Sequence, residues 1–340
     1  MATGGPPESD STFVMICRPG FNVNRLGSVA GIRIGFCRGF EQIGIRYRLM
    51  SVFDVARQLP RTRNPFVFLS MYDYLDLSSA SRRSLMNYPH FVWVNPWHPD
   101  LDKLLQDRSI FLSSSLEIPP RVAARVLESN PVFVFANVPP SCLRYYSVWK
   151  EKGCRVESIP LACDTTRYFP SPSDSRFSDV AMAFVGLYRP YKDIQYEKYL
   201  RPYEDILRVY GFGPIWPYKG YGGLIADDDV RVLYKNSKIC PALSEPHAEV
   251  TGDIPDRAFL VLGSFGLPVT DVTPSYRELF EPDELLVPES VEEYHALIKR
   301  ALTDSDFNQA YRRKGHEAVM RRHTYAHRAS TILRLLDIAQ

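Results

Sequence analysis

Residues 239–271 read ICPALSEPHAEVTGDIPDRAFLVLGSFGLPVTD, and this stretch decides how the whole chain is interpreted. A short apolar run at 239–243 leads into an acidic loop at 244–253. A helix-length apolar segment at 255–264 and a second short apolar run at 267–271 follow. The order strand, loop, helix, strand predicts a parallel sheet, in which ligands bind beyond the carboxyl ends of the strands and beside helix N-termini.

The helix predicted at 255–264 carries its own boundary signals. Asp253 is a candidate N-cap, Pro255 suits the first turn, and Gly266 suits the C-cap. Arg257 falls in the first turn, where a guanidinium can bind an anion with two parallel hydrogen bonds. The segment therefore predicts an anion site at the helix N-terminus.

Apolar runs of strand length recur along the chain, separated by segments of helix length. Parallel strands need such crossovers, so the pattern predicts an α/β protein with parallel sheets. The predicted strands are 13–17, 47–50, 66–70, 91–95, 132–136, 155–159, 180–185, 239–243 and 267–271, and the predicted helices include 29–43, 203–210, 230–236, 291–302, 306–322 and 326–338.

Composition excludes several classes of protein. The formal net charge of +2 argues against a general nucleic-acid binder, which would carry a strong basic excess. The six cysteines are scattered without a C-x-x-C pair, which is typical of reduced thiols in a cytoplasmic protein. No apolar run reaches the roughly 18 residues that a membrane span needs, which leaves peripheral membrane contact open.

The segment DIPDRAF at 253–259, followed by SFGLPVTD at 264–271, resembles the donor-site segment of GT-B glycosyltransferases. More narrowly, it is similar to the CgeB-like group, whose pattern runs roughly Arg-x-Phe-Glu-Ala-x-Ala-x-Gly-x-x-x-x-Thr-Asp. The similarity continues through ELFEP at 278–282 and ends at HTYAHR, residues 323–328. Leu260 stands where the group usually has a Glu that contacts the donor, so the resemblance leaves the donor undefined.

This resemblance implies the GT-B fold, with two Rossmann-like domains whose parallel sheets face each other across a cleft. The Pro- and Ser-rich stretch 169–175 is the best linker. We expect residues 1–12 to be a disordered lead-in, 13–168 the N-terminal acceptor domain and 176–322 the C-terminal nucleotide-sugar donor domain. By the resemblance, 323–340 forms a helix that packs back on the N-terminal domain.

The segment VGLYRPYK at 185–192 is similar to the segment with which GT-B enzymes hold the donor diphosphate. A leaving nucleoside diphosphate gains negative charge, and fixed cations stabilise that charge. We expect Arg189, Lys192 and Arg257 to bind the diphosphate, with Gly186 beside the donor. A solvated basic loop is the alternative.

The acidic loop supplies candidates for contact with the donor sugar. In retaining GT-B enzymes a carboxylate of this loop faces the sugar, so Glu249 or Asp253 is expected there as a catalytic group. Glu245 and His247 are expected to contact the sugar or a phosphate, against the alternative of a solvent-facing loop. For the nucleotide we expect Phe259 by the resemblance and Tyr218 by stacking, although Tyr218 could equally pack in the domain.

Candidates for the acceptor side lie after strands of the first domain. Gly20, Gly27 and Ser28 follow the first strand, where glycines allow close approach of a ligand, and Tyr72 follows another. His98 could act as a general base because its pKa can lie near 7, although a surface position is as plausible.

His323 and His327 have the i, i+4 spacing of metal ligands, but no third ligand follows, so we expect no metal. The leading hypothesis is a hexosyltransferase-type enzyme that moves a sugar from a nucleotide-sugar to an acceptor hydroxyl. Retention is what the resemblance implies, and no metal is expected to be required because the cations at 189, 192 and 257 replace it. The nucleotide-sugar is a substrate, so no cofactor is expected. One alternative is an inert nucleotide- or sugar-binding subunit of a glycan assembly complex. A second is a Rossmann-type oxidoreductase, and the absence of a full G-x-G-x-x-G argues against it.

Overall fold

A computed structural model describes residues 10–18, 28–95, 118–188, 190–211, 215–245 and 248–338. The chain forms two compact units. Unit 1 comprises Met1–Trp97, Ser115–Pro160 and Tyr325–Gln340, and unit 2 comprises His98–Ser114 and Leu161–Thr324. The division after Pro160 precedes the predicted linker at 169–175, because Cys163 already hydrogen-bonds to the carbonyl of His323 in unit 2.

Unit 1 is built on one parallel sheet with the strand order β2-β1-β3-β4-β5-β6. All of the strands expected in this part of the sequence form, with ends that differ by one or two residues. Their bounds are β1 Thr12–Cys17, β2 Arg46–Ser51, β3 Pro65–Ser70, β4 His90–Trp93, β5 Phe133–Ala136 and β6 Val156–Ser158.

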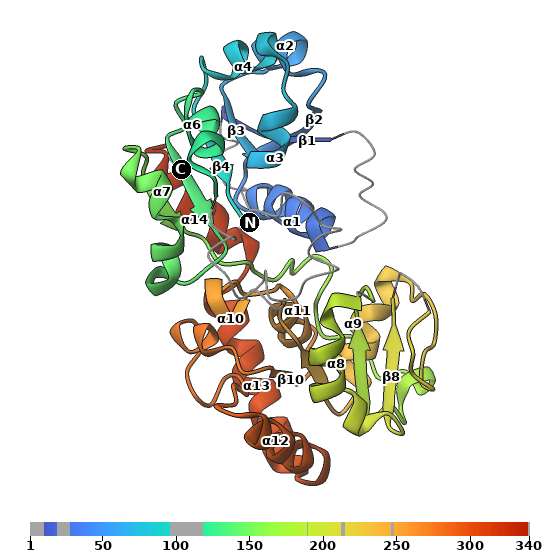
Figure 1. Cartoon of the computed structure of the whole chain (residues 1–340). Helices are drawn as coiled ribbons and strands as arrows, with labels where there is room; N and C mark the ends of the chain where they lie inside the picture. Colours follow the sequence, from blue (N-terminus) through green and yellow to red (C-terminus); the bar gives the residue numbers. More distant parts are fainter. Residues whose placement is uncertain are drawn as a thin grey trace, which may run out of the picture. The chain divides into compact units, whose positions relative to one another are not determined.

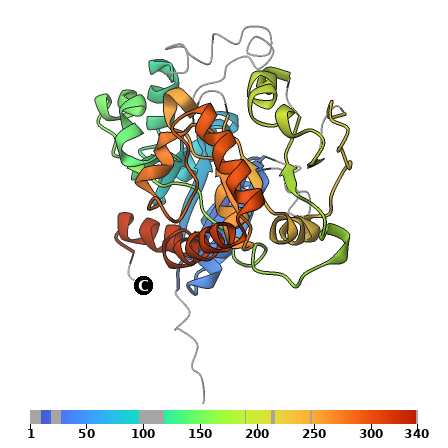
Figure 2. The same cartoon turned by 90° about the horizontal axis from the view of Figure 1, so that it is seen from below.

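Helices α1 (Ser28–Gln42) and α14 (Tyr325–Leu335) lie together in unit 1 and cover one face of its sheet. Figures 1 and 2 both show α14, in dark red, beside the blue α1. The contact is close because α1 carries glycines on this side: a Cβ on Gly35 would lie 2.3 Å from the Tyr325 ring. Phenylalanines fill the layer between α1 and the sheet, with Phe36 against Phe68 at a centroid distance of 5.3 Å.

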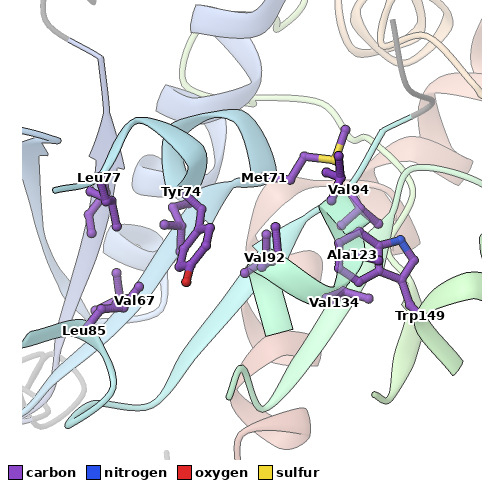
Figure 3. Close-up of a cluster of buried hydrophobic side chains, with 14 of the residues drawn as sticks. Val67, Met71, Tyr74, Leu77, Leu85, Val92, Val94, Ala123, Val134 and Trp149 are labelled. Carbon is purple, nitrogen blue, oxygen red and sulfur yellow. The ribbon is translucent and has the colours of Figure 1, made fainter. Parts of the chain in front are cut away.

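The opposite face of the same sheet carries the aliphatic core shown in Figure 3. Val67, Val92 and Val134 point from neighbouring strands toward Tyr74 and Trp149 of the covering helices. The elements on this side are α2 Val55–Gln58, η1 Leu59–Arg61, α3 Met71–Asp76, α4 Ser79–Leu85, α6 Pro120–Leu127, η4 Pro140–Tyr146 and α7 Ser147–Glu151.

Unit 2 has a second parallel arrangement of strands. Its strands are β7 Met182–Val185, β8 Leu207–Tyr210, β9 Cys240–Ala242 and β10 Pro268–Thr270. β8 pairs with β7 and β10 pairs with β9, and main-chain hydrogen bonds from Ile239 join β9 to β7. The order is therefore β8-β7-β9-β10, with all carboxyl ends at one edge.

Helices and short 3-10 turns surround these strands. Most of the predicted helices form, and Ser290 caps α12 by accepting from the amide of Glu293. The bounds are η5 Ser175–Phe177, η6 Pro190–Lys192, α8 Asp193–Tyr199, η7 Arg201–Tyr203, α9 Asp227–Asn236, α10 Ala248–Thr251, α11 Arg257–Gly263, η8 Pro274–Glu278, α12 Val291–Thr303 and α13 Ser305–Arg322.

The prediction of a helix at 203–210 is wrong, because Leu207–Tyr210 is strand β8. Leu207 and Val209 are buried while Arg208 between them is exposed, so the apolar period is two and the segment suits a half-buried strand. The aromatic residues at 203 and 210 obscured this alternation.

Both predicted boundary residues of α11 are also displaced. Asp256, not Asp253, is the N-cap, and the helix begins at Arg257. At the other end Phe265 takes the left-handed conformation, with φ of 62°, which a C-cap glycine usually adopts. Gly266 is needed for space instead, because a Cβ there would lie 2.7 Å from the carbonyl oxygen of Tyr234.

Candidate functional site

The candidate site lies in unit 2, where the carboxyl ends of β7, β9 and β10 meet the first turn of α11. This is the edge at which open parallel sheets bind ligands. The segments that follow these strands bring together Lys192, Glu245, Arg257 and Asp271, through the contacts described below.

Arg257 ties the ends of two strands together. Its Nε donates to the carbonyl oxygen of Val185 at 3.1 Å, and its Nη1 donates to that of Leu243 at 2.8 Å. The guanidinium also lies over the ring of Phe184, with its carbon 4.5 Å from the ring centroid. In the described part of the chain Nη2 has no hydrogen-bond partner, so this end of the side chain can bind an anion.

Lys192 follows β7 at the end of η6 and forms an ion pair with Glu245, which follows β9. The lysine side chain is only 12% exposed. Burial lowers the pKa of Lys192, and the nearby Glu245 carboxylate opposes that shift. A buried ammonium needs an anionic partner, and in this structure Glu245 provides it.

Gly186 leaves room for the Arg257 side chain. A Cβ at this position would lie 2.9 Å from the Phe184 ring and 3.2 Å from Nη2 of Arg257. Gly211, at the end of β8, approaches even closer, because a Cβ there would lie 1.8 Å from the carbonyl oxygen of Gly186. The strand ends are therefore packed backbone to backbone, and a side chain at position 186 would crowd Nη2 of Arg257.

Asp271, a buried carboxylate that was not among the predicted site residues, holds the loop that begins at Ser244. Asp271 accepts from the amide of Ser244 at 2.8 Å and from its hydroxyl at 2.9 Å. It also accepts from the hydroxyl of Thr273 at 2.7 Å. The available signal was the position of Ser244 and Asp271, each a polar residue directly at the end of a predicted apolar run.

Asp256 is the N-cap of α11, although its side chain makes no capping hydrogen bond. Burial raises the pKa of its carboxyl to about 6, and the adjacent Arg257 works against this shift. This carboxyl therefore titrates nearer to neutral pH than an ordinary aspartate.

The structure places the predicted sugar contacts of the acidic loop as follows. Glu245 pairs with Lys192, and Asp253 is half-buried in the loop that precedes α11. Glu249 lies in α10, and its side chain is outside the described part. Arg189 and His247 also lie outside the described residues, so their predicted roles remain predictions.

Two predicted nucleotide contacts are core residues instead. Tyr218 is 6% exposed, its hydroxyl donates to the carbonyl of Tyr196, and Arg201 covers its ring. Phe259 is fully buried against the rings of Phe280 and His323. Neither ring is available for stacking on a base, because apolar packing inside unit 2 takes both.

Among the candidates in unit 1, Tyr72 is half-buried in α3 and packs beside the aliphatic core. Ser28 is the first residue of α1, and Gly20, Gly27 and His98 lie outside the described residues. A buried ion pair that was not predicted from the sequence lies near the carboxyl end of β3, where Arg33 of α1 pairs with Asp73 of α3. The pairing could not be predicted because the two residues belong to different helices, 40 positions apart in the sequence.

His323 does not have the surroundings of a metal ligand. Its Nε2 lies 2.9 Å from the carbonyl oxygen of Leu279, and its ring packs on Phe280. Within the described ranges no group of three or more His, Cys, Asp or Glu side chains could hold a metal ion. In the same ranges no helix has both the length and the apolar character to cross a membrane.

Comparison with known proteins adds two findings. Residues 194–334, less than half of the chain, match the family described as glycosyl transferase-like. No curated protein matches the chain.

Similar solved structures cover nearly the whole chain. Sucrose-phosphate synthase from Thermosynechococcus elongatus has a TM-score of 0.64 at 12% identity, over 96% of this chain and 98% of that one. Anabaena HepE in complex with UDP and glucose also has a TM-score of 0.64 at 12% identity, over 96% and 100%. A mutant of the T4 phage protein BGT in complex with UDP-glucose has a TM-score of 0.60 at 10% identity, over 96% and 99%.

At these identities the structural similarity establishes the fold. The chain has the α/β GT-B fold of glycosyltransferases, with two Rossmann-like units built on parallel sheets, and its residues 194–334 match a glycosyl transferase-like family.

Proposed function

We propose that this protein is a glycosyltransferase that moves a sugar from a nucleotide-sugar donor to an acceptor hydroxyl. The observation that carries the proposal is the arrangement of Arg257 and Lys192 at the carboxyl edge of the unit 2 strands, beside Gly186. The GT-B fold and the family match over 194–334, which includes Arg257, support the same activity.

In this proposal Arg257 and Lys192 bind the donor diphosphate. The carbonyls of Val185 and Leu243 fix the guanidinium. Its Nη2 therefore needs no change of orientation to bind a phosphate oxygen. Lys192 keeps its ion pair with Glu245 and donates a further N–H to a phosphate oxygen. Arg189 belongs to the same proposal by its place in the sequence, between Gly186 and Lys192.

The transfer breaks the bond between the anomeric carbon and the phosphate oxygen, and the electron pair stays on that oxygen. The acceptor hydroxyl oxygen bonds to the anomeric carbon, and its proton passes to an oxygen of the leaving diphosphate. Because negative charge grows on the leaving phosphate, two fixed cations beside it lower the barrier. Their charge is the reason to propose transfer without a metal ion.

The remaining assignments follow from the resemblance. We propose a hexose as the transferred group, retention of the anomeric configuration, and Asp253 or Glu249 beside the donor sugar. The acceptor is proposed to bind mainly to unit 1, near Tyr72 and the residues that follow β1. Leu260 provides no polar contact for the donor, which distinguishes this chain from the usual pattern of the CgeB-like group.

The test is release of nucleotide from UDP-, GDP- and dTDP-sugars by the purified full chain, with and without EDTA. The proposal expects turnover of at least one donor with acceptor present, undiminished by EDTA. Proton NMR of the product then reports the anomeric configuration. Absence of turnover and of nucleotide binding with all three classes of donor would refute the proposal.

A further inference from the structure

Asp271 is a buried carboxylate in an unusual setting. Only 4% of the residue is exposed, and in the described part of the chain no lysine, arginine or histidine forms a salt bridge with it. Burying a carboxylate without a cation costs free energy, and hydrogen bonds must offset this cost. Asp271 receives three such bonds, and two of them come from Ser244.

These bonds hold the short turn that follows β9, in which Ser244 lies. The amide of Ser244 donates to Oδ2 of Asp271, while its hydroxyl and that of Thr273 both lie within 2.9 Å of Oδ1. The two hydroxyl oxygens are also 3.1 Å apart. The turn after β9 is thereby joined to the turn after β10, through both main-chain and side-chain contacts.

The neighbours of Ser244 connect this turn to the cations of the proposed donor site. Leu243, which precedes it, accepts from Nη1 of Arg257 at 2.8 Å. Glu245, which follows it, pairs with the ammonium of Lys192. Arg257 and Asp271 hold the turn from its two sides, so the place of Glu245, and with it that of Lys192, depends on Asp271.

We propose that Asp271 is a positioning residue for the proposed donor site, which sets the place of Lys192 through Ser244 and Glu245. The part of this inference that concerns the donor rests on the proposed function. Asp271 does not contact the donor; it keeps the turn rigid, so that the ammonium is already in place when the diphosphate arrives. Preorganised cations of this kind need no rearrangement during the reaction.

Three variants separate this role from simple stability. Asp271→Ala removes all three acceptor contacts. Asp271→Asn removes the charge and keeps the bonds, since its amide oxygen can accept from the Ser244 amide and its NH2 group can donate to the two hydroxyls. Ile298→Ala is the matched control, because Ile298 is fully buried in α12 of the same unit, outside the turn.

The first readout needs no ligand. Acetic anhydride acylates lysines, and mass spectrometry of the full chain gives the rate at Lys192 relative to the exposed Lys219, which serves as the internal reference. We expect Asp271→Ala to raise this relative rate at least five-fold, while Asp271→Asn and Ile298→Ala change it less than two-fold. If Asp271→Ala fails to fold, Ser244→Ala and Thr273→Val take its place, with smaller increases expected.

The second readout is the dissociation constant of UDP, measured by calorimetry. We expect Asp271→Ala to weaken binding about ten-fold or more, with Asp271→Asn and Ile298→Ala within three-fold of the wild type. If Asp271→Ala and Ile298→Ala behave alike in both readouts, the positioning role is refuted. If the wild type does not bind UDP, GDP or dTDP, the proposed function fails, and the acylation rates alone decide the role of Asp271.

Discussion

Nη1 of Arg257 lies 2.8 Å from the carbonyl oxygen of Leu243, so the first residue of α11 is bonded directly to the end of β9. The same side chain reaches Val185 at the end of β7. A guanidinium can satisfy two carbonyls and still present a free edge, which an ammonium cannot do with the same geometry. Arg257 is therefore both a structural tie between strands and a candidate ligand for phosphate.

Gly186 should be required for nucleotide binding more than for folding. In Gly186→Ala the new methyl group meets the Phe184 ring at 2.9 Å and Nη2 of Arg257 at 3.2 Å, so the guanidinium must move. We expect UDP binding to weaken about ten-fold, with a small change in melting temperature. Calorimetry and thermal unfolding measure the two effects.

Gly31→Ala is the control for this substitution, because a Cβ at Gly31 in α1 meets nothing within 4 Å. Alanine also favours a helix over glycine by roughly 0.5–1 kcal/mol. We expect this variant to be as stable as the wild type or slightly more so. Equal losses of UDP affinity in both variants would contradict the role given to Gly186.

Arg312 should be a main determinant of the stability of unit 2. It is buried in α13, no carboxylate among the described residues forms an ion pair with it, and its Nη1 donates to the carbonyls of Lys235 and Phe265 at 2.8 and 3.2 Å. These carbonyls lie at the C-terminal ends of α9 and α11, where a positive charge is favourable. We expect Arg312→Met to lower the free energy of unfolding by about 3 kcal/mol.

Urea unfolding checks this expectation, and the neighbouring Arg313 provides the control because it is exposed on the same helix. Arg313→Met should change the free energy of unfolding by less than about 0.5 kcal/mol. A loss of similar size in both variants would show that the carbonyl contacts of Arg312 contribute little.

Asp256 should make unit 2 less stable as the pH rises. Burial raises the pKa of this carboxyl from 3.8 to about 6, so the folded state holds the proton more tightly than the unfolded state. Between about pH 4 and 6 its contribution to stability is lost with rising pH, by roughly 2–3 kcal/mol. Asp256→Asn should therefore exceed the wild type in stability at pH 7.5 and match it near pH 4.

His90 should make unit 1 less stable as the pH falls. Its ring is buried with Nδ1 2.9 Å from the Tyr88 carbonyl and Nε2 2.9 Å from the Ser129 hydroxyl. Burial lowers its pKa from 6.5 to about 4, so the unfolded state takes up the proton first as the pH falls. Stability is then lost from about pH 6.5 down to 4, by roughly 3 kcal/mol, and urea unfolding of His90→Gln should lack this loss.

The fold could be predicted from the sequence where apolar runs were short and clearly bounded. The runs at 13–17, 66–70 and 267–271 became strands at those positions, since a buried parallel strand is apolar on both faces. The segment 203–210 was predicted as a helix, because with the tyrosines at its two ends the alternation of Leu207, Arg208 and Val209 was not recognised. Propensity alone does not distinguish such a short strand from a helical turn.

The site could be predicted only in part. Lys192, Arg257 and Gly186 were identified by type and place in the sequence, and the structure brings Gly186 within contact of Arg257. The role of Asp271 could not be inferred, because its partner Ser244 is 27 residues away and the contact depends on the pairing of β9 with β10. Tyr218 and Phe259 were assigned to the ligand because an aromatic side chain in the sequence does not reveal whether it packs inward.

The central claim is that Arg257 and Lys192 bind the diphosphate of a nucleotide-sugar. Calorimetry of the wild type, Lys192→Ala, Arg257→Ala and the double variant, each with UDP and with uridine, tests it most directly because uridine lacks the phosphates. The account predicts that the wild type binds UDP at least ten-fold more tightly than uridine, and that the double variant loses most of this preference. UDP binding of unchanged affinity in the double variant would contradict it.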